Sequence, residues 1–447
     1  MYQLRCSKTR LAAMFFVIAA IVGGNTYADK KQYSKILLTP FTNVATINAV
    51  TGPSGINHVE SDALAKKVAT AIATYVDTVD DRSPPTEFPA NWILGGLEGD
   101  VTIEEAILRI PTPFVIDPDH PMSKTNRKKI NVIEMCNPTF AKKAMGILPV
   151  VDGDDKTKII NGTIHAPALP CETAVYFDGT KIQIDMLNPV AIFTLFFTDV
   201  LFGEQMLNPE FAQEIQALPV QVNDEIVTII YAALEGAGVT FTEKHKPLGP
   251  KYQWLDEVVE EVANTPFESP FVHFTYTRVG DVKIDADYVK YIANTIVATA
   301  STDGTHDDDL NEQLNETDWR SARPHPLPIP GNQVIEMCSP TNAIKAMSTG
   351  MHHATALPCE VSVTAIEGGD KLLISYLDPH FMFNALFKDA FNQMSKEELA
   401  EFAALPPLVL EDLQTIVGYA LTNLGELSEP EQVCYNMLPT GGDCQDD

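Results

Sequence analysis

The feature that most constrains the fold of this chain is a stretch that occurs twice. Between residues 132 and 172 the chain holds the sequences VIEMC and HAPALPCE. Between residues 334 and 360 it holds VIEMC and HATALPCE in the same order. Residues 181–197 and 371–387 continue the similarity. Because it extends over several predicted elements, it predicts two domain-sized repeats of about 160 to 200 residues, and not a short solenoid unit.

Both repeats predict the same order of secondary structure. A strand ends at a proline that opens a short helix, and a second strand, a hairpin turn, a return strand and an apolar helix follow. The first repeat has predicted strands at 131–136, 171–177 and 181–187 and helices at 139–145 and 190–202. The second has strands at 334–338, 359–366 and 371–377 and helices at 341–347 and 380–392. A strand region at 36–48 and a helix at 61–75 precede the first repeat.

This order of elements resembles the family known as the domain of unknown function DUF302. The residues that carry the resemblance are Val132 to Pro138, Leu169-Pro170 and Ile182 to Pro189, and in the second repeat Val334 to Pro340, Leu357-Pro358 and Leu373 to Pro379. The resemblance implies a small domain with a β-α-β-β core that often pairs as a homodimer, without an established activity. The expected fold class is therefore α+β, with two tandem copies of a DUF302-like β-α-β-β-α domain packed as a pseudo-dimer.

The N-terminus predicts a secretory signal peptide at residues 1–28. Basic residues precede an apolar run from Leu11 to Val22, and small residues lead up to Ala28. The run is shorter than the roughly 20 apolar residues of a spanning helix. We therefore expect cleavage and a periplasmic or secreted protein without stable membrane insertion. The expected domains are 29–240 and 266–424, with a linker at 241–265 and a tail at 425–447.

The chain is strongly acidic. Its formal charge is −29, and removal of the signal, which holds three basic and no acidic residues, gives −32. Such a field disfavours nucleic acid and anionic membrane surfaces as partners. A small molecule or a protein partner is expected instead, bound by a monomer that contains the pseudo-dimer or by a homo-oligomer.

Six cysteines remain after the signal peptide, and an even number in an exported protein predicts disulfides. Each repeat holds one pair and the tail holds the third. The predicted bonds are Cys136–Cys171, Cys338–Cys359 and Cys434–Cys444. Each would stabilise the fold by roughly 3 kcal/mol through loop closure in the unfolded state.

A metal or haem site is the alternative interpretation of the same residues. Cys136, Cys171 and His165 would form one set, and Cys338, Cys359 and His353 the other. Thiolate and imidazole ligands suit copper or zinc, and His353 with a methionine would suit haem. The spacing of these residues argues against a metal site, because no C-x-x-C or H-x₃-H motif occurs. Met135 and Met337, adjacent to cysteines on strands, are expected to point to the opposite face.

Four further side chains at matched positions are candidates for ligand binding. His165 and His353 precede the Leu-Pro step, and Glu134 and Glu336 precede the first cysteine of each repeat. The plainer alternatives are loop histidines bonded to backbone, and glutamates that are solvated or paired with lysine. Glu172 and Glu360 are the only second matched carboxylates.

These patterns favour an exported, non-enzymatic binding protein whose duplicated domains hold a small ligand or a protein partner between them. The sequence contains no glycine-rich phosphate loop, no G-x-S-x-G motif and no evident Ser/His/Asp arrangement. The alternative functions are a metal- or haem-binding protein that uses Cys, His and Met, and a thiol redox protein.

Overall fold

The computed structural model describes a chain of mixed helix and sheet. The described residues are 40–80, 92–95, 101–116, 126–146, 164–169, 171–201, 208–252, 254–255, 270–280, 283–301, 306–321, 324–326, 331–357, 359–391 and 393–433. The predicted signal peptide and the predicted Cys434–Cys444 bond lie outside these residues. Below, residues 40–255 are called the first half and residues 270–433 the second half.

The first half forms a seven-stranded sheet, called the first sheet. Its strand order is β4-β6-β7-β8-β1-β9, and β5 also pairs with β6. The strands are β1 (Phe41–Asn48), β4 (Ile93–Leu94), β5 (Leu108–Val115), β6 (Arg127–Cys136), β7 (Cys171–Phe177), β8 (Lys181–Leu187) and β9 (Thr242–Glu243). A separate ribbon pairs β2 (Thr51–Gly52) with β3 (Gly55–Ile56).

The second half forms another seven-stranded sheet with the same order. This second sheet runs β11-β13-β14-β15-β10-β16, and β12 also pairs with β13. Its strands are β10 (Phe271–Thr277), β11 (Arg320–Ser321), β12 (His325–Pro326), β13 (Asn332–Cys338), β14 (Cys359–Ile366), β15 (Lys371–Leu377) and β16 (Glu431–Val433). Each strand of the second sheet therefore corresponds in position to one strand of the first sheet. All strand pairings in the two sheets are antiparallel.

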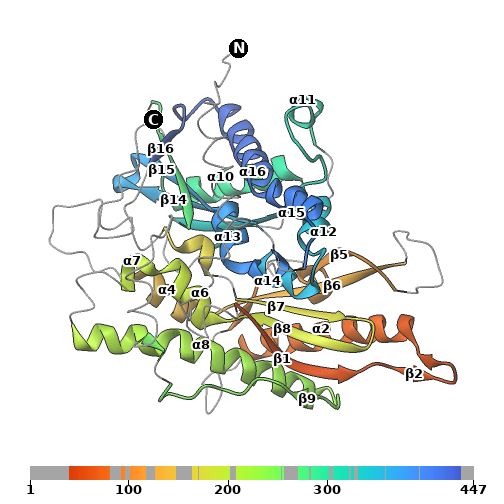
Figure 1. The fold of residues 1–447 in the computed structure, drawn as a ribbon. Coiled ribbons are helices and arrows are strands. Elements are labelled where there is room, and N and C mark those ends of the chain that lie inside the picture. The colour runs from red at the N-terminus through yellow and green to blue at the C-terminus, as the bar shows by residue number, and fades with distance from the viewer. Residues whose placement is uncertain are drawn as a thin grey trace.

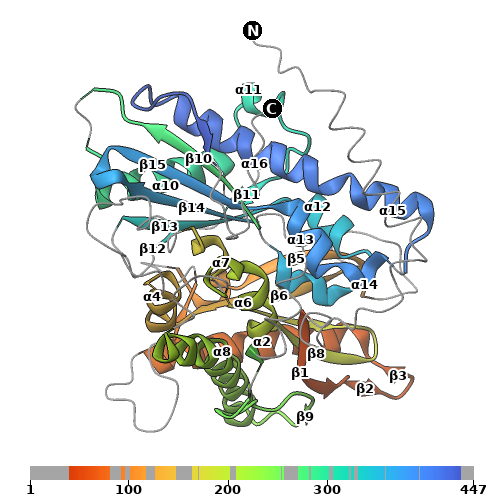
Figure 2. The same cartoon turned by 60° about the vertical axis from the view of Figure 1, so that its left-hand side comes forward.

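Long helices cover the outer face of each sheet. α2 (His58–Asp80) and α8 (Pro209–Gly236) pack on the first sheet, and α10 (Ala286–Ala300) and α16 (Leu405–Thr422) pack on the second (Figures 1 and 2). The shorter helices are α3 (Ile103–Ala106), α4 (Pro138–Gly146), η1 (Ala166–Ala168), α6 (Pro189–Phe196), α7 (Thr198–Leu201), α11 (Asp308–Asn311), α12 (Pro340–Ala346), η3 (Met351–Ala356), η4 (Glu367–Gly369), α13 (Pro379–Leu386), α14 (Lys388–Phe391) and α15 (Lys396–Ala403).

The inner faces of the two sheets are turned toward each other, with short helices between them (Figure 2). Helix η1 of the first half contacts β14 and β15 of the second, and η3 of the second half contacts β7 and β8 of the first. The rings of Phe196 and Phe381 meet across this interface with centroids 5.5 Å apart. Because each half covers the inner sheet of the other, a single apolar core joins the halves.

The strand predictions were accurate where hydrophobic residues alternate with turn signals. β7, β8, β14 and β15 have the predicted bounds. The predicted helix at 190–202 divides at Phe197 into α6 and α7, and the predicted helix at 380–392 divides at Phe387 into α13 and α14. Strands β5 and β10 were not predicted. The α+β class is confirmed.

Within the described residues, no helix combines the length and apolar character needed to cross a membrane.

At one edge of each sheet, a tryptophan side chain is hydrogen-bonded to a carboxylate on an outer helix. Trp92, just before β4, donates from Nε1 to Oε2 of Glu225 at 2.6 Å. Trp319, just before β11, donates to Oδ2 of Asp412 at 2.8 Å. Asp412 is 0% exposed and also accepts the backbone N–H of Asn315 at 2.7 Å. Glu225 is only partly buried, so the second contact matters more for stability.

We predict that Asp412→Ala lowers the free energy of unfolding by about 3 kcal/mol, because it leaves the buried Trp319 indole without an acceptor and also removes the acceptor of the Asn315 and Glu316 backbone N–H groups. Glu225→Ala is the matched control and is expected to cost about 1 kcal/mol, since Glu225 itself is only partly buried and water can take the place of its carboxylate. Denaturant unfolding of both variants measures the difference. Equal losses would contradict the role assigned to the burial of Asp412.

Candidate functional site

Four glutamates meet where the inner faces of the sheets oppose each other. Glu134 on β6 stands directly opposite Glu172 on β7, and Glu336 on β13 stands directly opposite Glu360 on β14. Directly opposed residues in an antiparallel pair project to the same face. Glu134 and Glu336 are hydrogen-bonded to each other, which joins the two pairs across the interface. This group is called the carboxylate cluster below.

The carboxylate cluster is almost completely removed from water. The exposed fractions are 8% for Glu134, 4% for Glu172, 7% for Glu336 and 4% for Glu360. Carboxyl oxygens of Glu172, Glu336 and Glu360 lie within 4.8 Å of one another. Four ionised groups cannot coexist so closely in a poorly solvated site. The glutamates must therefore share protons or a cation.

The pKa directions agree with this conclusion. Burial, followed by the charge of Glu336, raises the pKa of Glu360 well above its usual range. Burial and the neighbouring Glu360 do the same to the pKa of Glu172. Burial also raises the pKa of Glu134, although the hydrogen bond to Glu336 opposes the shift. Carboxyl groups that keep their protons at neutral pH can donate hydrogen bonds to the remaining carboxylates.

Gly95 leaves the space that Glu134 needs. Its backbone N–H donates to the carbonyl oxygen of Glu134 at 3.0 Å. A Cβ atom at this position would lie 2.1 Å from Oε2 of Glu134, which is far inside van der Waals contact. Glycine is therefore required at the end of β4 for Glu134 to hold its place.

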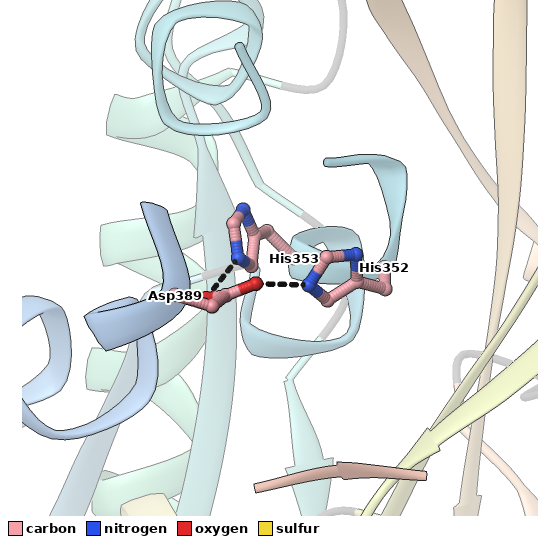
Figure 3. Close-up of side chains that lie close together, drawn as sticks. All are labelled: His352, His353 and Asp389. Carbon is pink, nitrogen blue, oxygen red and sulfur yellow. Dashed lines mark hydrogen bonds and ion pairs between the residues drawn. The ribbon is translucent and has the colours of Figure 1, made fainter. Parts of the chain in front are cut away.

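A second polar group forms around Asp389, at the start of α14 (Figure 3). Nε2 of His352 lies 2.8 Å from Oδ2 of Asp389, and Nε2 of His353 lies 2.9 Å from Oδ1. Partial burial opposes ionisation of Asp389, but the two histidine hydrogen bonds outweigh it and hold its pKa well below the usual range. Burial lowers the pKa of His353 despite its bond to Asp389. Asp389 is thus a carboxylate and His353 a neutral imidazole at neutral pH.

Aromatic rings hold the two predicted histidines in a reciprocal arrangement. His353 lies against Phe387 of its own half and Phe41 of the other half, with centroid distances of 4.6 and 5.3 Å. His165 lies against Phe197 of its own half at 4.4 Å and Phe271 of the other half at 5.9 Å. Both imidazoles are fully buried. His353 also bonds the backbone of Ala346, as the plainer alternative expects of a loop histidine.

His352 and Asp389 form part of the wall of a cavity between the halves. The cavity has a volume of about 460 Å³. The first half contributes Asn43, Tyr176, Gln183 and Asp185 and the apolar Pro40 and Phe41, and the second half contributes His352, Ala385, Leu386, Lys388 and Asp389. Asp185 accepts hydrogen bonds from the Tyr176 hydroxyl and, at 2.6 Å, from Nδ2 of Asn43. Burial raises the pKa of Asp185, although these hydrogen bonds oppose the shift.

The predicted Cys338–Cys359 disulfide is wrong, because both cysteines are free. Met337, and not Cys338, stands opposite Cys359. Neighbouring residues on a strand point to opposite faces, so Cys338 and Cys359 pack against different cores. Cys136 is also free, which contradicts the predicted Cys136–Cys171 bond.

The cysteines do not gather with the histidines either. The side chains of Cys338, Cys359 and His353 are all described, yet they form no common donor group. The side chain of Cys171 lies outside the described part, so the other predicted set stays a prediction. Burial raises the pKa of Cys136 and Cys359 to about 12, whereas a reactive thiol needs a lowered pKa. Met135 and Met337 lie in the outer cores. Met337 thus points away from Cys338, as predicted, but it shares its core with Cys359.

Sequence reasoning found two members of the carboxylate cluster and their matched partners, but it missed His352 and Asp389. The residue that matches His352 in the first repeat is Ile164, so recurrence gave no signal for His352. A signal for Asp389 did exist. The offset of 190 residues that aligns 181–197 with 371–387 also aligns Asp199 with Asp389.

Comparisons with known proteins support the resemblance for one half. Residues 322–404 match the family model described as Domain of unknown function DUF302. This segment includes Glu336, Glu360, His352, His353 and Asp389. The match concerns the second predicted repeat, so the predicted family resemblance is confirmed there and the tandem arrangement is not. Neither the curated proteins nor the solved structures include a match to the chain.

We predict that unfolding the native protein without a reductant releases Cys136, Cys338 and Cys359 as titratable thiols. Before unfolding they should react slowly with an aromatic disulfide reagent, because burial keeps them protonated. Serine variants at the three positions assign the signal. Thiols that appear only after reduction would restore the disulfide interpretation.

A second prediction concerns the carboxylate cluster and pH. The raised pKa of Glu360 means that the folded state keeps a proton that the unfolded chain loses above about pH 4.5. Wild-type stability therefore falls as pH rises from there toward the raised pKa. Glu360→Gln removes this loss, so its stability relative to wild type should increase by about 1 kcal/mol or more between pH 5 and pH 8.

Denaturant unfolding at pH 5, 6.5 and 8 provides the measurement for Glu360→Gln. Glu401→Gln, at an exposed position on α15, is the control and should show no comparable trend. A pH-independent difference for Glu360→Gln would mean that the cluster is neutralised by something other than protons.

Proposed function

We propose that this chain is a binding protein that holds a small polar molecule in the cavity between its two halves. The observation that carries the proposal is that both halves supply polar groups to one cavity of about 460 Å³. Cavities of this size suit small organic ligands. A molecule bound there would contact the first sheet on one side and η3 and α14 on the other.

The charges around the cavity indicate the class of ligand. Two acidic side chains, Asp185 and Asp389, face two basic ones, His352 and Lys388. Because acidic and basic side chains share this wall, a ligand with a large net charge would meet groups of its own sign as well as of the opposite sign. Asn43 and Gln183 add amide groups that both donate and accept hydrogen bonds. A neutral or zwitterionic polar molecule fits this wall best.

The arrangement of the halves fits a pseudo-dimer of two DUF302-like domains in one chain. Supporting observations are the equal strand orders, the reciprocal placement of η1 and η3, and the paired histidine–phenylalanine contacts. The N-terminal sequence supports export to the periplasm or the exterior. An exported binding protein is a simple role for a chain whose halves together line a partly open cavity with polar side chains in its wall.

The thiol redox alternative receives no support from the described cysteines. Their pKa values are raised by burial, and none of the three is paired with a second cysteine. The chemistry of a redox centre requires a thiolate at neutral pH. The binding role therefore remains the better one.

We predict that at least one compound from a set of free amino acids and monosaccharides raises the melting temperature of the full chain. At about 100 times its Kd, a ligand stabilises the folded state by about 2.7 kcal/mol. Gln183→Ala removes a polar group from the cavity wall and should weaken such a ligand about tenfold.

Gln432→Ala is the matched control, because Gln432 lies exposed on β16 and does not line the cavity. It should leave the ligand's effect unchanged. Stabilisation that is equally strong in Gln183→Ala, or no stabilisation by any member of the set, would count against this site.

A further inference from the structure

The group around Asp389 has the composition of a metal-binding site. It brings two imidazole nitrogens and one carboxylate together, and these ligand atoms all lie within 4.8 Å of one another. Both histidines present Nε2 toward the same carboxylate, from adjacent positions on η3 (Figure 3). Two histidines and one carboxylate are the donors of many zinc sites and of mononuclear non-haem iron sites. A shift of these side chains by a fraction of their present separation would place them around one ion.

The surroundings of His353 fix its ring in a suitable orientation. The ring is packed between Phe41 and Phe387 and has no exposed surface. Its Nδ1 lies 3.4 Å from Oγ1 of Thr349, and the ring also bonds the backbone of Ala346. Metal-binding histidines usually engage their second nitrogen in this way, which leaves the first nitrogen for the ion.

His352 is positioned by a glycine and a phenylalanine. A Cβ atom at position 350 would lie 2.3 Å from Cε1 of His352, so Gly350 makes room for this ring. Phe41 meets the same ring edge-on, with centroids 5.0 Å apart. The first half of the chain thus helps to hold both imidazoles of the second half.

The three side chains around Asp389 differ in their exposure to solvent. Asp389 has 44% of its side chain exposed and His352 has 29%, whereas His353 has none. His352 and Asp389 also line the cavity between the halves. An ion held by the three side chains would therefore keep free coordination positions on the cavity side, as exchangeable sites do.

We propose that His352, His353 and Asp389 bind one divalent transition-metal ion of the zinc and iron(II) class, with its free positions directed into the cavity. The ion would give the small polar ligand an anchoring point. This inference rests on the proposed function for the role of the ion, but not for its binding. The carboxylate cluster is a different kind of site, because its donors are all oxygens.

The test is a titration of the purified full chain with Co²⁺ after dialysis against a chelator. Visible absorption bands of protein-bound Co²⁺ should saturate at one ion per chain, and Zn²⁺ should displace them. His352→Gln and Asp389→Asn should each weaken Co²⁺ binding at least tenfold. A purely structural hydrogen-bond role for Asp389 predicts no saturable spectrum in the wild-type chain.

Two control variants separate the possible sites. His306→Gln alters a histidine on another part of the second half, and Glu360→Gln alters the carboxylate cluster; both should retain the Co²⁺ spectrum. The inference would be overturned if the wild-type chain did not bind one Co²⁺ per chain. It would also be overturned if His352→Gln and Asp389→Asn both bound Co²⁺ as tightly as the wild-type chain. Binding that is lost in Glu360→Gln but kept in Asp389→Asn would do so as well.

The outcome can be distinguished from that of the proposed function, because no organic ligand is present in the titration. If Co²⁺ fails to bind while a small molecule still stabilises the chain, the metal inference alone fails. If Co²⁺ binds as predicted but no small molecule stabilises the chain, the proposed ligand class alone fails.

Discussion

Four carboxyl groups face one another in the middle of this molecule, and the rest of the structure has to accommodate them. Glu134 and Glu172 come from the first sheet, and Glu336 and Glu360 come from the second. Each is nearly inaccessible to water. Burying such groups is costly unless protons or a cation neutralise them. The apolar contacts that surround the cluster, such as Phe196 with Phe381, must therefore hold the sheets together against this cost. The proton content of the interface and its stability are linked.

The same mutual packing builds the polar cavity. Phe41 belongs to the first half but contacts both histidines of the second half, and η3 of the second half lies on β7 and β8 of the first. Neither half alone would hold His352, His353 and Asp185 around a common space. The cavity is therefore a property of the assembled chain, and its polar wall depends on the interface that the carboxylate cluster occupies.

Much of the fold and part of the site could be predicted from the sequence. The strands β7, β8, β14 and β15 were found because alternation and turn residues mark them locally. Glu134 and Glu336 were singled out because they recur. The cysteine pairs predicted within the two repeats were wrong because recurrence does not reveal register, and a register shift of one residue moves a side chain to the other face. Asp389 was missed because its histidine partners lie more than 35 residues earlier and meet it only through tertiary packing. A contact between residues so far apart in the sequence leaves no local pattern from which it could be predicted.

The joining of two similar halves in one chain has a consequence for how such a site can change. Strand register places Asp185 where the second sheet has Ser375, Tyr176 where it has Thr364, and Asn43 where it has His273. In a dimer of identical chains every substitution is made twice, so a new acidic or tyrosine side chain would appear on both sides of the axis. In a single chain the two halves can be substituted independently. One half can acquire polar side chains at the cavity while the matching positions of the other half keep their packing, and one gene encodes both.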